Sequence, residues 1–129
     1  MKRDLDLVRK ILLAIEAMDN GRVDCDIEIS GFTKDQIGYH VFLMGQADLL
    51  KVVDISNLDS KSPQAEPIHL TWAGHEFLDA SRDEDLWSKA KSKVLKPAGG
   101  FAFDILLEWL KAAVKQKIGL LLPSSAGHV

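Results

Sequence analysis

The stretch from Phe32 to Leu78 constrains the fold more than any other part of the chain, because its hydrophobic spacing changes in a fixed order. It begins with a helix-length segment, TKDQIGYHVFLMGQADLL, and continues with LKVVDIS, a short run that contains β-branched residues. A polar loop follows, and IHLTWAGHEFLD then starts as a second apolar run and re-enters a helix. The order helix, strand, loop, strand, helix predicts a small α+β domain that contains a β-hairpin.

The central helix is predicted over residues 34–46, with Ser30 or Thr33 as its N-cap. The hairpin loop is predicted over residues 56–67, where Asn, Asp, Ser and Pro suit a long exposed turn. A helix followed by such a hairpin is typical of a winged helix-turn-helix domain. In that interpretation the central helix is the recognition helix, the hairpin is the wing, and the helix expected before them is short or degenerate.

Before the central helix, the sequence predicts one long helix and one extended segment. Apolar residues recur at the i, i+3, i+4, i+7 spacing from Leu5 to Met18, so a helix is expected over residues 4–19. The partial alternation in VDCDIEIS, residues 23–30, favours a short edge strand or an extended connector. Both segments belong to the same predicted domain as the hairpin.

After the hairpin, helical patterns predict a C-terminal extension. Thr71 can cap one helix, and the acidic residues 83–85 open a further one. The sequence Pro-Ala-Gly-Gly at residues 97–100 is a strong break, after which residues 101–118 form the last helix. The chain is therefore predicted as a single domain with three parts: a winged-helix-like core over residues 1–80, C-terminal helices over 81–118 and a tail over 119–129.

The last predicted helix has apolar residues on two sides, which is more than one core requires. Leu106 and Leu110 belong to one stripe, and Trp109 extends the apolar surface to a second side. We therefore expect this helix to mediate self-association through Leu106, Trp109 and Leu110, and the chain to be a homodimer.

The composition is that of an ordinary globular protein and supplies no general attraction for nucleic acid. Of 129 residues, 47% are hydrophobic and 27% are charged, which excludes a disordered chain. Lys and Arg number 16 against 19 Asp and Glu, so the net charge of −3 counts against simple DNA binding. Cys25 is the only cysteine, which excludes an internal disulfide and a cysteine-based zinc cluster. Neither a signal peptide nor a membrane span is recognisable, so we expect a cytoplasmic protein.

Motifs for catalysis or metal binding are missing from the sequence. The four histidines lack close spacing such as His-x3-His, and His75-Glu76 does not continue into HExxH because Asp79 occupies the last position. A packed or capping role accounts better for these histidines. No nucleophile elbow, P-loop or dinucleotide-binding glycine turn occurs, and Cys25 has no base that the sequence identifies. We therefore predict a non-enzymatic protein with no catalytic residue, no metal and no cofactor.

Three segments resemble one known family: MKRDLDLVRKILLAIE at the start, GYHVFLMGQADLLKV in the middle and LTWAGHEFLDASRDEDLW after the hairpin. They are similar to a bacterial and prophage family called domain of unknown function 2513, over roughly residues 1–110. The resemblance implies a winged-helix-like domain of mobile-element origin, and it brings no activity or catalytic residues. Related sequences commonly read leaGL after the central helix, where this chain has GQADLL, so a small sequence difference falls at the helix end.

The first functional interpretation is a DNA-binding or transcription-regulator-like protein. Residues 34–46 would enter the groove of double-stranded DNA, residues 56–67 would touch its backbone, and a dimer would supply two half-sites. The helix is poorly equipped to read bases, because its outward face includes Asp35 and no arginine. The residues expected at this nucleic-acid or partner contact are Lys34, Gln36, Tyr39, Phe42, Gln46, Lys51 and Lys61.

The alternative is a protein-binding adaptor or inhibitor that docks the same surface on a host protein. Tyr39 and Phe42 would be its anchors if they are exposed, because aromatic residues contribute strongly to interfaces; otherwise Phe42 turns into the core. The surface around Lys34, Lys51 and Lys61 separates the two interpretations. A continuous basic strip favours DNA, whereas an acidic or apolar surface favours protein.

Overall fold

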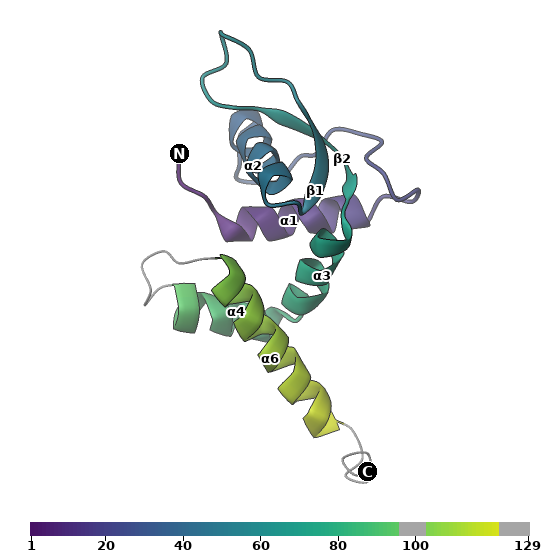
Figure 1. The fold of residues 1–129 in the computed structure, drawn as a ribbon, viewed down its shortest axis with the longest axis vertical. Coiled ribbons are helices and arrows are strands. Elements are labelled where there is room, and N and C mark those ends of the chain that lie inside the picture. Colours follow the sequence, from purple (N-terminus) through teal and green to yellow (C-terminus); the bar gives the residue numbers. More distant parts are fainter. Residues whose placement is uncertain (96–102, 122–129) are drawn as a thin grey trace. The chain divides into compact units, whose positions relative to one another are not determined.

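The computed structural model describes residues 1–95 and 103–121, and it has the predicted α+β class (Figure 1). Its elements are the helices α1 (Leu5–Glu16) and α2 (Lys34–Gln46), the strands β1 (Leu50–Asp54) and β2 (Ala65–Leu70), the helices α3 (Trp72–Ser81) and α4 (Glu84–Ala90), the π-helical turn η1 (Lys91–Leu95) and the helix α6 (Phe103–Leu121). The chain divides into two compact units, Met1–Leu78 and Asp79–Val129. The predicted break at 97–100, the predicted helix start at 101–102 and the last residues of the predicted tail, 122–129, lie outside the described residues.

Helix α1 begins where Asp4 caps it. The Asp4 carboxylate accepts hydrogen bonds from the backbone N–H groups of Asp6 and Leu7, at 2.9 and 3.2 Å. The apolar stripe of the helix is buried and consists of Leu5, Leu7, Val8, Ile11, Leu12 and Ile15. The helix ends at Glu16 and not at residue 19, because turns follow it and lead to Gly21, whose φ is 71°.

Helix α2 has the bounds that the sequence predicts, and Thr33 is its N-cap. Thr33 Oγ1 accepts a hydrogen bond from the N–H of Gln36 at 3.1 Å, and Gln36 Oε1 accepts one from the N–H of Thr33 at 2.8 Å. This capping box satisfies N–H groups that the start of a helix leaves unpaired. The chain turns after the helix at Asp48, whose φ is 60°, and β1 begins two residues later.

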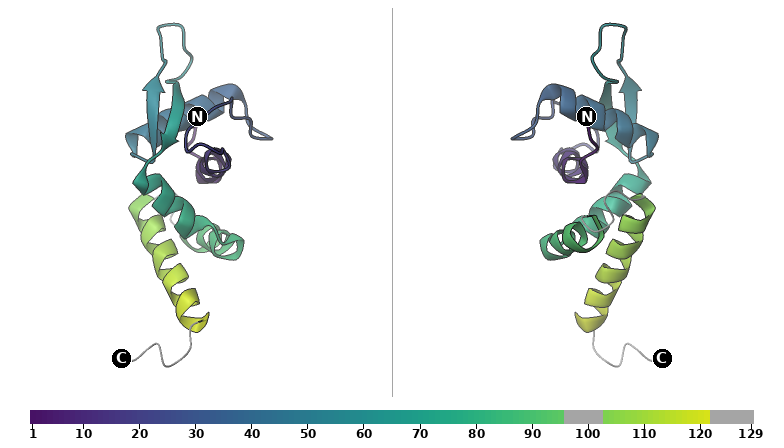
Figure 2. Two further views of the ribbon diagram at one scale, coloured as in Figure 1. Left: turned by 90° about the vertical axis from the view of Figure 1, so that its right-hand side faces the viewer. Right: turned by 90° about the vertical axis from the view of Figure 1, so that its left-hand side faces the viewer.

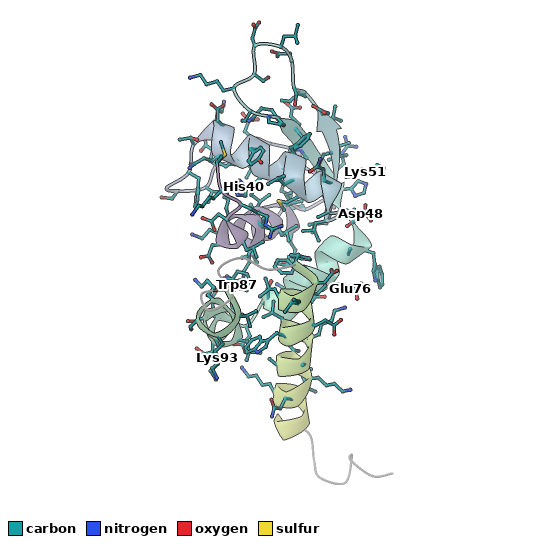
Figure 3. All side chains as sticks on the ribbon, turned by 60° about the vertical axis from the view of Figure 1, so that its left-hand side comes forward. His40, Asp48, Lys51, Glu76, Trp87 and Lys93 are labelled. Atoms are coloured by element: carbon teal, nitrogen blue, oxygen red, sulfur yellow. The ribbon has the colours of Figure 1, made fainter. Side chains whose placement is uncertain are left out.

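His40 joins α2 to the start of α1 from inside the core, as Figure 3 shows. Its side chain is 2% exposed. Nε2 accepts a hydrogen bond from the N–H of Asp4 at 2.9 Å, and Nδ1 lies 2.8 Å from the carbonyl oxygen of Gln36. Because Nε2 is an acceptor, Nδ1 carries the proton and donates it to Gln36. His40 is therefore a packed histidine that also satisfies the backbone of another helix.

The strands β1 and β2 form an antiparallel hairpin that packs beside α2. The register runs from Leu50 opposite Leu70 to Asp54 opposite Ala65, with a bulge along the way. Pro67 lies at this bulge, where a strand tolerates the missing N–H. The hairpin therefore accommodates a proline without losing its pairing on either side.

The hairpin loop is shorter than the predicted segment 56–67, because Ala65 to Pro67 already belong to β2. Figure 2 shows the loop extending beyond α2. Its end is attached to the first turn of α2, since Gln64 Nε2 donates to the carbonyl oxygen of Asp35 at 3.1 Å. Gly38 makes room for this contact, because a Cβ at that position would lie 1.8 Å from Gln64 Oε1.

The connector, residues 17–33, runs from α1 to α2 and contains neither a helix nor a strand. The predicted alternatives for VDCDIEIS therefore resolve to an extended connector. One backbone hydrogen bond joins it to β2, from the N–H of Val23 to the carbonyl oxygen of Ile68 at 2.8 Å. Near its end, the Phe32 ring lies under the Lys10 ammonium group of α1, at 5.6 Å. The helix expected to precede the recognition helix is therefore not formed here.

Gly74 on α3 lies against the backbone just before β1, and this close approach leads to a prediction. A Cβ at Gly74 would be 2.1 Å from the carbonyl oxygen of Leu49, which is a backbone atom and cannot rotate away. Gly74→Ala should therefore lower the free energy of unfolding by about 1 to 3 kcal/mol, the usual cost of overpacking. Urea denaturation followed by circular dichroism measures the change.

The matched control is Gly119→Ala on α6, because nothing lies within 4 Å of a Cβ at that position. Alanine is better than glycine inside a helix by up to about 1 kcal/mol, so the control should leave stability unchanged or raise it. Equal stability of the two variants would contradict the close approach of α3 to Leu49.

In the second unit, α4 contacts both η1 and α6. Asp83 caps α4 by accepting a hydrogen bond from the N–H of Leu86 at 3.1 Å. Leu106 and Leu110 of α6 are fully buried within the chain. They are therefore core residues, which corrects their predicted place in a dimer interface. On the same helix Trp109 is half-buried and Ile105 is exposed.

The Asp83 carboxylate also accepts a hydrogen bond from the ammonium group of Lys117 on α6. This bond is the main cause that lowers the pKa of Asp83 below its ordinary value and raises the pKa of Lys117 above its own. Stabilisation by a carboxyl group with a lowered pKa is complete above its unfolded pKa and is lost as the pH falls through the folded one. For a lysine with a raised pKa, stabilisation is lost as the pH rises through the folded value.

We predict that Lys117→Met makes the acid loss of stability shallower, because it removes the main cause of the lowered Asp83 pKa. The free energy of unfolding, measured by urea denaturation between about pH 2 and about pH 6, should change less with pH than in the parent chain. Lys115→Met on the same exposed helix is the control and should keep the parent slope. Identical slopes for Lys117→Met and the parent chain would refute a role for this ion pair.

Candidate functional site

A groove with a volume of about 510 Å³ opens in the first unit between the connector, the first half of α2 and the hairpin. The residues that line it are Val23–Ile27 of the connector, Lys34, Ile37, Gly38 and Val41 of α2, and Ile55 and Gln64–Pro67 of the hairpin. Its volume lies within the range of about 300 to 1,000 Å³ that is usual for ligand sites.

The floor and the rim of this groove differ in polarity. Ile37 and Val41 of α2 are buried beneath it and give it an apolar floor. Asp24, Asp26 and Glu66 are exposed and line its sides. The groove therefore combines apolar packing with negative charge, which suits a ligand that is apolar on one side and basic on the other.

The structure disperses the residues predicted from the sequence to contact DNA or a partner. Gln36 is committed to the capping box, so its side-chain oxygen Oε1 is already in use. Tyr39 and Phe42 are half-buried. They are therefore not fully exposed anchors, and Phe42 does not turn fully into the core. Gln46 is exposed, and Lys34 both is exposed and lines the groove.

Lys51 and Lys61 lie at different ends of the hairpin. Lys51 pairs with His69 near the start of β1, beside Asp48 (Figure 3). Lys61 lies in the loop that joins the strands, beyond the pair of Asp54 and Ala65. These lysines therefore do not form the continuous basic strip that would favour DNA.

The basic residues of α1 do not repair this deficit. Arg9 is buried, with 6% of its surface exposed, and Lys10 lies over the Phe32 ring. Across Met1–Leu78, thirteen Asp and Glu residues stand against eight Lys and Arg residues. The unit that contains the central helix and the hairpin is therefore acidic.

The hairpin and its surroundings carry exposed apolar side chains that the sequence prediction did not select as a site. Trp72, the first residue of α3, is 82% exposed, and Leu58 in the loop is fully exposed. The other exposed members of this group are Val53, Ile55 and Ile68. The sequence could have indicated this exposure. Val53 and Ile55 follow the charged Lys51 at intervals of two residues, so they point to the same side of an extended chain.

Cys25 lies in the lining of the groove, but its surroundings make it a poor nucleophile. A hydrogen bond with the Asp24 side chain is the largest of the causes that raise the pKa of the Cys25 thiol, and the charges of Asp24 and Asp26 add to it. The thiolate is the reactive form, so a raised pKa reduces reactivity at neutral pH. The thiol is part of the groove wall.

Among residues 1–95 and 103–121, no three His, Cys, Asp or Glu side chains come together in a group that could hold a metal ion. Within the same ranges, no helix has the length and apolar character needed to cross a membrane. The groove described above is the candidate functional site.

The described residues form a small fold of helices and one hairpin with an acidic-sided groove, and comparison with known proteins identifies the family of the chain. The chain belongs to the family described as "Hypothetical protein (DUF2513)", whose model matches residues 2–101. It is also similar to a Haemophilus influenzae (strain Rd) protein that is named only as an uncharacterised protein. The two are 30% identical over 119 residues, which cover 92% of this chain and 99% of the relative. No solved structure matches the chain.

Proposed function

We propose that the chain is a cytoplasmic, non-enzymatic module that binds a partner protein through the hairpin side of its first unit. The exposure of Trp72 is the main support for this proposal. The side chain is 82% exposed, so a large apolar area is left in water. Tryptophan is enriched among the residues that dominate the energy of protein interfaces. Val53 and Ile68 on the hairpin are also exposed and add apolar area to the same unit.

The acidic character of this unit supports a partner with a basic surface. Complementary charge speeds the encounter of two proteins and disfavours partners of the wrong sign. Asp24, Asp26 and Glu66 are exposed beside the groove, where they would meet Lys or Arg side chains. We therefore propose a partner that presents a basic, partly apolar surface to the hairpin side.

A DNA-binding winged helix is the second candidate. One observation favours it: α2 directly precedes a hairpin whose loop extends beyond the helix, which is the arrangement of a recognition helix and its wing (Figure 2). The absence of a helix between Glu16 and Lys34 and the acidic charge of the unit weigh against it.

A homodimer and a mobile-element origin also remain proposals. A dimer contact through α6 would use Ile105 and Trp109, which reach the surface.

Titration with random-sequence duplex DNA separates the two candidates. The measurement uses fluorescence anisotropy at about 50 mM and about 200 mM salt, with light scattering on the same sample to obtain the mass. Protein binding predicts no micromolar affinity at either salt concentration. Micromolar affinity that falls steeply with salt would reject the proposal and favour the winged-helix candidate.

A photocrosslinking amino acid at position 72 supplies the positive test in cells, with the same amino acid at Ser88 on α4 as the control. The protein crosslinked at position 72 and not at position 88 is then purified, and its affinity for the parent chain and for Trp72→Ala is measured. Trp72→Ala should weaken binding by about thirtyfold, since hot-spot residues contribute about 2 kcal/mol or more. Equal affinity of the two chains would reject Trp72 as the anchor.

A further inference from the structure

The outer edge of β2 is paired at one end and open at the other. The N–H of Val23 donates to the carbonyl oxygen of Ile68, which closes the edge there. Beyond this bond, residues 24–27 of the connector and residues 65–67 of β2 line opposite sides of the groove. The described part of the connector makes no further backbone hydrogen bond to β2. The groove therefore lies where another strand would continue the sheet.

Ala65 directs its backbone polar groups to this outer edge. The N–H of Ile55 donates to the carbonyl oxygen of Gln64 at 3.0 Å, so these two residues form a hydrogen-bonded pair. In an antiparallel ladder, the next pair has its N–H and C=O groups pointing away from the partner strand. That next pair is Asp54 and Ala65. The N–H and C=O of Ala65 are therefore available to an added strand.

Side-chain alternation along β2 fixes the chemistry of the added strand. Ala65 is 4% exposed, whereas Glu66 next to it is exposed. A residue paired with Ala65 places its side chain on the same inner side, over Ile37 and Val41 of α2. Its two neighbours point outward, where Glu66 and the connector carboxylates favour Lys or Arg. The groove thus favours alternating apolar and basic residues.

We propose that the groove binds an extended segment of the partner protein, which adds as a strand to the edge of β2 at Ala65. Its apolar side chains pack on the floor formed by Ile37 and Val41, and its basic side chains lie beside Asp24, Asp26 and Glu66. Strand addition of this kind takes affinity from backbone hydrogen bonds and specificity from alternate side chains. The inference rests on the proposed protein-binding function and names the form of the ligand.

The test uses a fluorescein-labelled peptide, Thr-Val-Lys-Val-Arg-Val-Thr, with acetylated and amidated ends, and measures its binding to the full chain by anisotropy. Two further peptides isolate the two sources of affinity. One carries N-methyl groups on alternate residues, which removes backbone donors and keeps the side chains. The other replaces Lys and Arg by Glu. Each should bind at least about tenfold more weakly, because two backbone hydrogen bonds contribute about 1 kcal/mol each and like charges repel.

Variants of the chain test the same contacts from the other side. The double substitution Asp24→Asn and Asp26→Asn should weaken binding of the parent peptide. Glu28→Gln should not, because Glu28 is an exposed connector residue outside the groove lining. Ala65→Pro removes the outward N–H that the ladder with β1 does not use. This variant should bind the parent peptide more weakly, while its circular dichroism spectrum stays unchanged. If this variant loses its fold, the N-methylated peptide still decides the backbone contribution on the parent chain.

Equal binding of the parent, N-methylated and Glu-containing peptides would overturn the inference. Self-association that the peptide displaces, detected by light scattering, would assign the groove to a second copy of this chain and also overturn it. Failure here is distinguishable from failure of the proposed function. If the peptide does not bind but the protein crosslinked at position 72 does, the groove assignment is wrong and the docking role of the hairpin side stands.

Discussion

Trp87→Ala is expected to lower the free energy of unfolding by about 3 to 5 kcal/mol, the usual cost of truncating a buried aromatic residue. Trp87 on α4 is 2% exposed, so its removal loses a large buried apolar area and leaves a cavity. Typical domains have a total stability of about 5 to 15 kcal/mol, so the variant should melt at a much lower temperature. Urea denaturation followed by circular dichroism measures the loss.

Trp72→Ala is the matched control, because it makes the same chemical change at a residue that is 82% exposed. Substitutions at such surface positions usually change stability by less than about 0.5 kcal/mol. The control also separates two properties, since Trp72→Ala should impair partner binding and leave folding intact. A loss of stability as large for Trp72 as for Trp87 would show that the burial described for these two residues is wrong.

His40→Ala is expected to lower the free energy of unfolding by about 2 to 4 kcal/mol. The substitution removes a buried ring that accepts a hydrogen bond from Asp4 and donates one to Gln36. A donor or acceptor left unpaired in the interior costs about 1 to 3 kcal/mol, and the lost packing adds to that. Because the N–H of Asp4 belongs to the N-cap of α1, amide hydrogen exchange in the first turn of α1 should also become faster.

His75→Ala serves as the control for His40, because His75 is exposed on α3. It should change the free energy of unfolding by less than about 0.5 kcal/mol and leave exchange in α1 unchanged. A His40→Ala variant with the stability of His75→Ala would reject the role of His40 as the link between α2 and α1.

The helix starts could be predicted from the sequence because they depend on local chemistry. Thr33 followed by Gln36 forms a capping box within four residues, and it gives α2 its predicted first residue. Thr71 Oγ1 accepts a hydrogen bond from the N–H of Gly74 at 3.0 Å, as the prediction of a cap requires. Asp83 likewise caps α4. Each of these signals needs only neighbours along the chain.

Tertiary contacts decided the features that the sequence could not supply. Pro67 reads as a loop residue, but a bulge in the hairpin accommodates it inside β2. The sequence predicts that Leu106 and Leu110 mediate self-association, but the chain itself buries them. The groove has the same character, since the connector and β2 are separated by the whole of α2 in the sequence. No local sequence pattern indicates that these two segments lie on opposite sides of one groove.

Position 38 belongs both to the groove and to the contact between α2 and the hairpin loop. Gly38 lines the groove, and its missing Cβ is what allows Gln64 to rest on the first turns of α2. A Cβ there would displace the flexible end of the Gln64 side chain, whose Nε2 donates to the carbonyl oxygen of Asp35. A single methyl group at this position would therefore break the attachment of the Gln64 side chain to α2, and the series Gly, Ala, Ser offers a way to adjust this side of the groove.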